Sequence, residues 1–310
     1  MAALEILGLA KSYPTGFWRK TLRPALSPLQ LTVHEGETFG FLGPNGAGKT
    51  TTLKLLMGII FPTSGSARIL GRDFRDPDVK REVGFLPEQP YFYDYLSAPE
   101  LLDYYARLSG VPEEERRKRI PELLERVGLA DAGNKQLRKF SKGMLQRVGL
   151  AQAIIHNPRL IFFDEPMSGL DPIGRREVRE LIQGLKDEGK TIFLTTHILS
   201  DAESLCDRVA IIHNGELRGI GVVEDLTSKS ADKTEVAWRG AQALPAVSNL
   251  LAEEHVTGDI VRAVVASEQI DALLEKLRQQ RAHVISVTPI LGTLEDYFVA
   301  QTSGQKEVTV

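Results

Sequence analysis

The chain has 310 residues, of which 42% are hydrophobic and 25% are charged, and its formal net charge is -3 at pH 7. This composition is that of a globular protein, and the length favours one large domain followed by a smaller one. The small negative charge argues against a surface that binds nucleic acid or anionic lipid. A single cysteine, Cys206, excludes an internal disulfide and favours a reducing compartment.

The N-terminal residues, MAALEILGLAKSY, lack both the basic start and the long apolar core of a signal peptide. No apolar stretch approaches the roughly 20 residues that a membrane-spanning helix requires. We therefore expect a soluble chain. Any function at a membrane would then depend on a separate membrane-spanning protein.

The first chemical motif follows a predicted strand at residues 38–42. Residues 43–50, GPNGAGKT, match the phosphate-binding pattern G-x-x-x-x-G-K-[ST], and residues 50–57 predict a helix. Glycines let the backbone turn tightly and aim N–H groups at phosphate oxygens, and the helix N-terminus adds positive partial charge. Lys49 is expected to reach the β- and γ-phosphates, and the Thr50 hydroxyl to ligate Mg²⁺. The predicted ATP-binding residues of this segment are Gly43, Pro44, Asn45, Gly46, Ala47, Gly48, Lys49, Thr50 and Thr51.

Residues 98–128 have a helical pattern, and two short apolar runs follow at residues 160–163 and 191–195. Uninterrupted apolar runs of this length suit strands that are buried on both faces of a parallel sheet. A long helical stretch between strands therefore predicts a helical subdomain inserted into an α/β core.

The run at residues 160–163 leads directly into two carboxylates, Asp164 and Glu165. Acidic residues often end strands, so this feature alone is modest evidence. Beside a P-loop, it indicates the second nucleotide element. Asp164 is expected to hold Mg²⁺, usually through water, and Glu165 to polarise the attacking water as general base.

Between these two elements, residues 140–147 read FSKGMLQR, which resembles the Leu-Ser-Gly-Gly-Gln signature of ABC (ATP-binding cassette) proteins. In that family the signature of one subunit caps the γ-phosphate bound by the other, so the resemblance implies a head-to-tail homodimer. The signature residues acting in trans would be Ser141, Lys142, Gly143 and Met144. The Ser141 hydroxyl and the Gly143 N–H would donate to the γ-phosphate from a helix N-terminus.

Three further positions extend the resemblance, which covers roughly residues 3–225. Asp171 closes a Ser-Gly-Leu-Asp segment that looks like the D-loop, which runs along the dimer seam. His197, after the run TIFLTT, looks like the switch histidine that contacts the γ-phosphate and orients the water. Tyr13 looks like the aromatic residue that stacks on adenine, although an ordinary surface or core tyrosine is the alternative there.

The implied fold is an α/β P-loop NTPase, an ABC cassette with a RecA-like core sheet, an antiparallel β-subdomain and an inserted helical subdomain. We expect the cassette to span residues 1–228, with the helical subdomain at about residues 90–158. Its cofactors would be ATP and Mg²⁺. A small α+β domain, of ferredoxin-like type, would follow at residues 229–310.

The chain departs from the family pattern at two places. Signature Gly is replaced by Lys142 and Gln by Met144, as in a subset of ABC exporters. At the Q-loop, which meets Mg²⁺ and faces the membrane partner, the usual Gln after a proline is replaced by Glu88, and Gln89 follows. Either Glu88 takes over the metal ligation, which we favour, or Gln89 does so after a shift of one residue.

The C-terminal residues 291–298, LGTLEDYF, resemble the end of ATP-binding subunits of ABC-2-type exporters. The predicted function is therefore the ATPase subunit of an exporter that drives a separate transmembrane permease, at the cytoplasmic face of the membrane. An importer is the alternative within transporters. A non-transport ABC ATPase acting on nucleic acid or ribosomes is the rival class, but such proteins usually carry two cassettes or a long coiled-coil arm. No nucleic-acid partner is expected.

The C-terminal region carries no motif for chemistry. Its pattern predicts a strand at residues 233–239, a helix at 241–253, a hairpin turning at Gly258 and Asp259, a helix at 268–281, a strand at 283–288 and a short final helix. This βαββαβ order suits a ferredoxin-like unit. We expect the unit to regulate or reinforce the dimer, with small-ligand sensing and a passive extension as the alternatives.

Overall fold

The computed structural model describes residues 1–16, 21–132, 135–228, 233–240, 251–290 and 292–302. Two compact units divide between Gly221 and Val222, whereas the sequence placed the boundary after residue 228. Among the described residues, no helix combines the length and hydrophobicity needed to cross a bilayer.

The first unit is built on a six-stranded sheet of order β10-β9-β3-β8-β7-β6. Its strands are β3 (Thr38–Leu42), β6 (Val83–Leu86), β7 (Leu160–Asp164), β8 (Thr191–Thr196), β9 (Arg208–His213) and β10 (Glu216–Val222). β6, β7, β8, β3 and β9 pair in parallel. Every residue of β3, β7 and β8 is buried, which confirms that the apolar runs are interior strands.

A second, antiparallel sheet has the order β2-β1-β4-β5. It consists of β1 (Ala2–Thr15), β2 (Thr21–His34), β4 (Ser64–Ile69) and β5 (Arg72–Asp73). Its buried face shares one hydrophobic core with the parallel sheet, in which Ile6 and Leu29 pack with Phe39, Phe162 and Phe193. Ala47, in the segment after β3, is buried in the same core.

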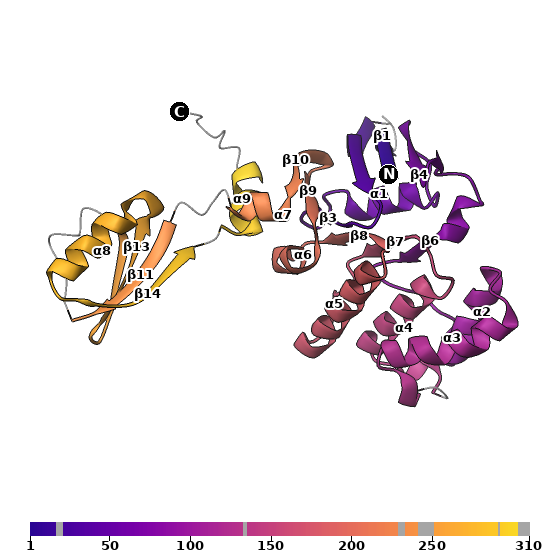
Figure 1. Ribbon diagram of the computed structural model, residues 1–310. Coiled ribbons are helices and arrows are strands. Elements are labelled where there is room, and N and C mark those ends of the chain that lie inside the picture. The colour runs from indigo at the N-terminus through magenta and orange to yellow at the C-terminus, as the bar shows by residue number, and fades with distance from the viewer. Residues whose placement is uncertain (17–20, 133–134, 229–232, 241–250, 291, 303–310) are drawn as a thin grey trace. The chain divides into compact units, whose positions relative to one another are not determined.

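The helices of the first unit are α1 (Lys49–Leu56), α2 (Ala98–Leu108), α3 (Glu113–Arg126), α4 (Lys142–Ile154), α5 (Pro172–Asp187) and α6 (Leu199–Leu205), with short 3₁₀ turns at Val79–Glu82, Ala130–Ala132 and Leu137–Lys139. In Figure 1, α2, α3 and α4 lie below the strands of the parallel sheet, and the antiparallel sheet lies above them. α2, α3 and α4 all fall between β6 and β7 in the chain, so the predicted helical insertion is present.

The second unit contains a four-stranded antiparallel sheet of order β12-β13-β11-β14. Its elements are α7 (Val223–Ser228), β11 (Lys233–Arg239), β12 (Leu251–Thr257), β13 (Ile260–Ala266), a 3₁₀ turn at Ser267–Gln269, α8 (Ile270–Gln279), β14 (His283–Ile290) and α9 (Leu294–Thr302). Leu273 and Leu277 of α8 pack on Trp238 and Val261 in a small core of their own. Together with the cassette, this unit confirms the predicted α/β fold with a small α+β addition.

One predicted helix is wrong at its end. Residues 251–253 were expected to finish a helix at 241–253, but they start β12, which pairs with β13. The cross-strand ladder outweighs the helical preference of the local sequence Leu-Ala-Glu-Glu. The rest of that prediction, residues 241–250, lies outside the described residues, so the ferredoxin-like type of this unit stays a prediction.

Candidate nucleotide-binding site

The P-loop joins β3 to α1, and its glycines have conformations that other residues would not adopt. Gly46 and Gly48 have φ values of 80° and 111°, in a region where a Cβ atom causes strain. A Cβ on Gly43 would lie 2.3 Å from the carbonyl oxygen of Ile212 in β9. The three glycines therefore let the loop pass close to β9 and turn at once into α1.

Lys49 is buried at the first position of α1. Its Nζ donates to the carbonyl oxygens of Gly43, at 2.6 Å, and Pro44, at 3.3 Å. The same Nζ lies 3.2 Å from Glu165 Oε1, an ion pair without the geometry of a hydrogen bond. The lysine thus spans the loop and carries its charge to the end of β7.

Asp164 is the last residue of β7 and is buried. Burial raises the pKa of its carboxyl, while hydrogen bonds from Thr195 and Thr50 act in the opposite direction. Thr195 Oγ1 donates to Asp164 Oδ1 at 2.6 Å. The two predicted magnesium ligands, Thr50 and Asp164, are therefore neighbours in the fold.

Glu165 follows with a left-handed backbone, at φ 50°. Its N–H donates to the carbonyl oxygen of Thr195 at 3.2 Å and to its Oγ1 at 3.1 Å. Its Oε2 lies 2.9 Å from Nδ1 of His197, which directly follows β8. The carboxylate is thus held between Lys49 and His197, the residue predicted to orient the attacking water.

A cavity of about 220 Å³ lies over the P-loop. Its lining brings together Ala25, Pro44, Asn45, Gly46, Gly48, Lys49, Thr50, Thr51, Glu88 and Glu165. Glu88 lines this cavity and Gln89 does not. Ala25 in β2 was missed by the sequence reasoning, because an alanine in a strand gives no chemical signal.

The donor set suits Mg²⁺ bound together with a nucleotide. Among the described residues, no three His, Cys, Asp or Glu side chains form a metal cage. Mg²⁺ in nucleotide sites usually keeps several waters and takes one or two protein oxygens beside the phosphates. The Thr50 hydroxyl and the Asp164 carboxylate, with Glu88 on the cavity wall, are donors of that kind.

Tyr13 is not among the residues that line the P-loop cavity. It is in β1, opposite Arg23 of β2, and 39% of its surface is exposed. The Lys11 ammonium lies 5.0 Å from the centre of its ring. Its stacking on adenine therefore stays a prediction.

The signature residues line a different cavity. Ser141 caps the N-terminus of α4, and its Oγ accepts a hydrogen bond from the N–H of Met144 at 3.3 Å. A cavity of about 670 Å³ is lined by Ser141, Lys142, Gly143, Met144, Gly169 and Asp171, among other residues. Asp171 caps α5 by accepting from the N–H of Gly174 at 2.7 Å. No described residue lines both this cavity and the P-loop cavity.

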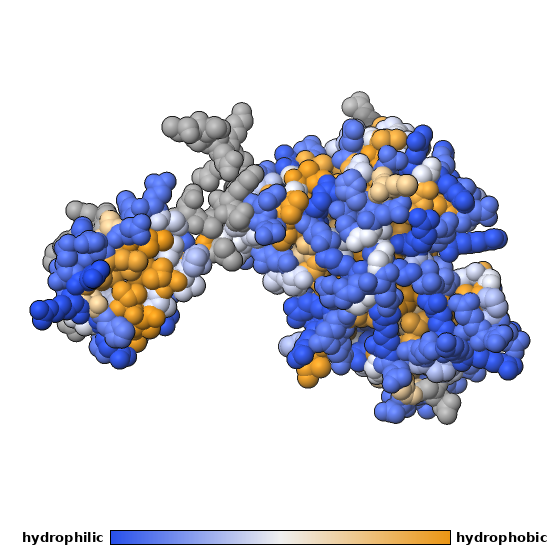
Figure 2. Space-filling view, viewed as in Figure 1, coloured by the Kyte–Doolittle hydropathy of each residue, from blue (hydrophilic) through white to orange (hydrophobic). Residues whose placement is uncertain are grey.

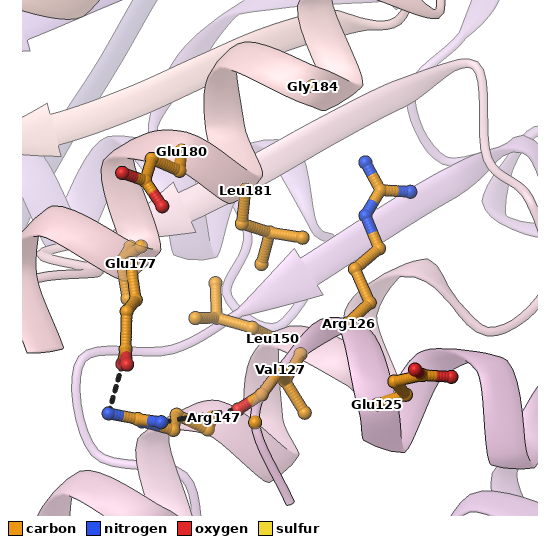
Figure 3. A pocket seen from close by; sticks show the side chains of 11 residues that line it. Glu125, Arg126, Val127, Arg147, Leu150, Glu177, Glu180, Leu181 and Gly184 are labelled. Atoms are coloured by element: carbon orange, nitrogen blue, oxygen red, sulfur yellow. Dashed lines mark hydrogen bonds and ion pairs between the residues drawn. The ribbon is translucent and has the colours of Figure 1, made fainter.

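The signature helix is tied to α5. Figure 3 shows Arg147 of α4 paired with Glu177 of α5 beside a cavity of about 420 Å³, which α3 also lines. Nearer the core, Gln146 Nε2 donates to the carbonyl oxygen of Pro166 at 3.0 Å, and both groups are buried. These contacts join the signature helix to α5 and to the segment that leads into the D-loop.

The chain is similar to known proteins over most of its length. A family model described as ABC transporter matches residues 26–168. An ABC transporter ATP-binding protein of Synechocystis sp. is 45% identical over 300 residues, which cover 96% of this chain and 84% of that protein. The bacitracin transport ATP-binding protein BcrA of Bacillus licheniformis is 39% identical over 289 residues, which cover 89% and 92%.

Solved structures match as well. The ATP-binding subunit of an ABC transporter superposes with a TM-score of 0.65 and 33% identity, over 74% of this chain and 93% of that one. An ATP-binding cassette solved as a dimer in a post-hydrolysis state, with ADP and Pi bound, has a TM-score of 0.64 and 28% identity, over 71% and 98%. The chain therefore belongs to the ABC transporter ATP-binding proteins, and its reaction is the hydrolysis of ATP.

Proposed function

We propose that two copies of the chain bind two ATP molecules between them, each between the P-loop of one copy and the signature of the other. The supporting observation is the separation of the two cavities. Lys49, Thr50 and Glu165 line one of them, whereas Ser141, Gly143 and the neighbouring D-loop line the other. A second copy would supply the signature that each P-loop cavity lacks within its own chain, and a similar cassette has been solved as a dimer with ADP and Pi bound.

Within each site, Glu165 would act as general base on the attacking water, and His197 would hold that carboxylate in position. Thr50, Asp164 and Glu88 would hold Mg²⁺, which when bound offsets the negative charge of the phosphates. Lys49 would turn from Glu165 toward the β- and γ-phosphates. Asp171 would run along the seam beside the opposite site.

Closure of the dimer would then push on a separate transmembrane permease, and hydrolysis would reset it. The relative named for bacitracin transport supports a transport role. The direction of transport is inferred from two features that resemble exporter subunits. The first is the pair Lys142 and Met144 in the signature, and the second is the Leu294-Glu295-x-x-Phe298 segment that starts α9. This proposal places the chain at the cytoplasmic face of the membrane.

The decisive experiment combines a hydrolysis-deficient variant with co-purification. The Glu165→Gln chain should form a dimer with ATP, measured by light scattering, and should retain a multi-span membrane protein when purified in mild detergent. A monomer at saturating ATP, both with and without that membrane protein, would reject the shared site. Retention of ribosomes or nucleic acid in place of a membrane protein would favour the rival class.

A further inference from the structure

β14 is an edge strand with one partner. In the order β12-β13-β11-β14, it pairs with β11 and ends the sheet. It is eight residues long, and the N–H and C=O groups on its outer side have no strand beside them among the described residues. Such an edge is a ready template for another strand, and proteins usually protect it with charges, bulges or cover.

Protection by charge is missing on this edge. The sequence of β14, HVISVTPI, contains no Asp, Glu, Lys or Arg. Ile285, Val287 and Ile290 are 49%, 42% and 37% exposed, and Figure 2 shows apolar side chains on the surface of this unit. β12, at the opposite edge, has the sequence LAEEHVT, which includes Glu253 and Glu254.

We propose that β14 pairs in antiparallel fashion with β14 of a second copy, so that the two C-terminal sheets join into one. The inference deepens the proposed function, since it rests on the homodimer and assigns the C-terminal unit a place in it. The contact is isologous, because the same strand contributes from both copies.

The charge pattern selects a second copy as the occupant. When a strand pairs with itself about a twofold axis, one residue faces its own counterpart and its neighbours face related residues. Any charge near the axis therefore meets a like charge, which is destabilising. β14 avoids this penalty, whereas two β12 strands would not. Pro289 lacks an N–H group, so the pairing is confined to residues 283–288.

A cysteine scan of the full chain tests the pairing directly. Ile285, Ser286 and Val287, at the middle of the paired range, are replaced singly by cysteine in a Cys206→Ala background, so that no other thiol is present. Residues facing each other across antiparallel strands have Cβ atoms about 4.5–5.5 Å apart, close to disulfide geometry. One position should give an oxidised homodimer on a non-reducing gel. Val256 on β12 is also exposed, and the Val256→Cys chain should migrate as a monomer on the same gel.

A charge variant gives an independent measurement. Ile285→Lys should weaken dimerisation about tenfold, because two lysines then lie at or beside the axis, while Val256→Lys, at a similarly exposed position, should leave it unchanged. Thermal melts of both variants control for folding. If no scanned cysteine cross-links, or Val256→Cys cross-links as well, the β14 pairing is wrong. If only the β14 pairing is wrong, the Glu165→Gln chain should still dimerise with ATP. If ATP-dependent dimerisation is lost in every variant, the proposed function is rejected instead.

Discussion

Lys49 Nζ lies 3.2 Å from Glu165 Oε1, and both side chains are almost completely buried. The cation predicted to bind phosphate is thus neutralised by the predicted general base. Removing one member of a buried pair leaves the other charge without compensation, which commonly costs about 3–5 kcal/mol. The two residues should therefore be altered with isosteric changes wherever the readout is function.

Glu165→Gln keeps the shape of the side chain but removes the base. ATP hydrolysis should fall at least ~100-fold, since general-base catalysis supplies about that much or more. ATP affinity should hold or rise, because Lys49 loses its competing anion. Glu180→Gln, on the exposed face of α5, is the matched control and should hydrolyse ATP normally. Wild-type turnover by Glu165→Gln would show that another group is the base.

The Ser141 hydroxyl caps α4, and it is also predicted to donate to the γ-phosphate bound by the partner. These two roles can be separated. Asp and Asn are both good N-caps, so neither Ser141→Asp nor Ser141→Asn should destabilise the helix. Only the aspartate adds a negative charge where the γ-phosphate of the partner is expected. In the Glu165→Gln background, Ser141→Asp should abolish the ATP-dependent dimer, and Ser141→Asn should retain part of it. Equal behaviour of the two would argue against a phosphate contact.

Glu88 and Gln89 are the two candidates for the Q-loop residue that ligates Mg²⁺. Because Glu88 lines the P-loop cavity, Glu88→Gln should raise the Mg²⁺ concentration needed for half-maximal hydrolysis several-fold. Gln89→Ala should leave that concentration unchanged. Measuring Mg²⁺ dependence for both variants at saturating ATP decides the question, and a larger shift for Gln89→Ala would reverse the assignment.

The predicted stacking of Tyr13 on adenine is tested by removing or exchanging its aromatic ring. Stacking of a base on an aromatic side chain is worth about 1–3 kcal/mol. Tyr13→Ala should therefore weaken ATP binding at least about fivefold, whereas Tyr13→Trp should preserve it. Tyr91→Ala removes another exposed tyrosine and controls for non-specific effects. Unchanged affinity in Tyr13→Ala would leave Tyr13 as an ordinary surface residue.

Removal of the C-terminal unit separates binding from assembly. A chain ending at Ser230 retains every residue of the P-loop cavity, so ATP affinity should remain within about twofold of the full chain. Dimerisation and transport should weaken more than nucleotide affinity. A truncated chain that is folded by circular dichroism yet does not bind ATP would contradict this division of labour.

The sequence predicted the motifs that are local in the chain. Glycine spacing in residues 43–50 and the run before Asp164 follow from backbone geometry and burial, and the fold agrees with both. Contacts between distant segments were not predictable in this way. Ala25 reaches the P-loop cavity from β2 only because the two sheets share a core.

Thr195 was also missed, although a signal for it existed. It is a polar residue inside the buried run TIFLTT, and its hydroxyl connects Asp164 with the N–H of Glu165. A buried hydroxyl in an apolar strand needs a partner, and that need could have directed attention to it. For the helix wrongly predicted at residues 251–253 no such signal existed, since pairing with β13 cannot be inferred from local propensity.

The left-handed backbone of Glu165 has a consequence for engineering. Asn157 and Asn214 adopt similar φ values, 57° and 51°, and asparagine tolerates that region well. Glutamate at φ 50° is unfavourable by about 1–2 kcal/mol. Replacing Glu165 with asparagine or glycine would relieve that strain, but it would leave the buried charge of Lys49 without its partner, which costs more, about 3–5 kcal/mol. Any stabilised version of this protein should therefore keep glutamate at position 165 and tolerate the backbone strain there.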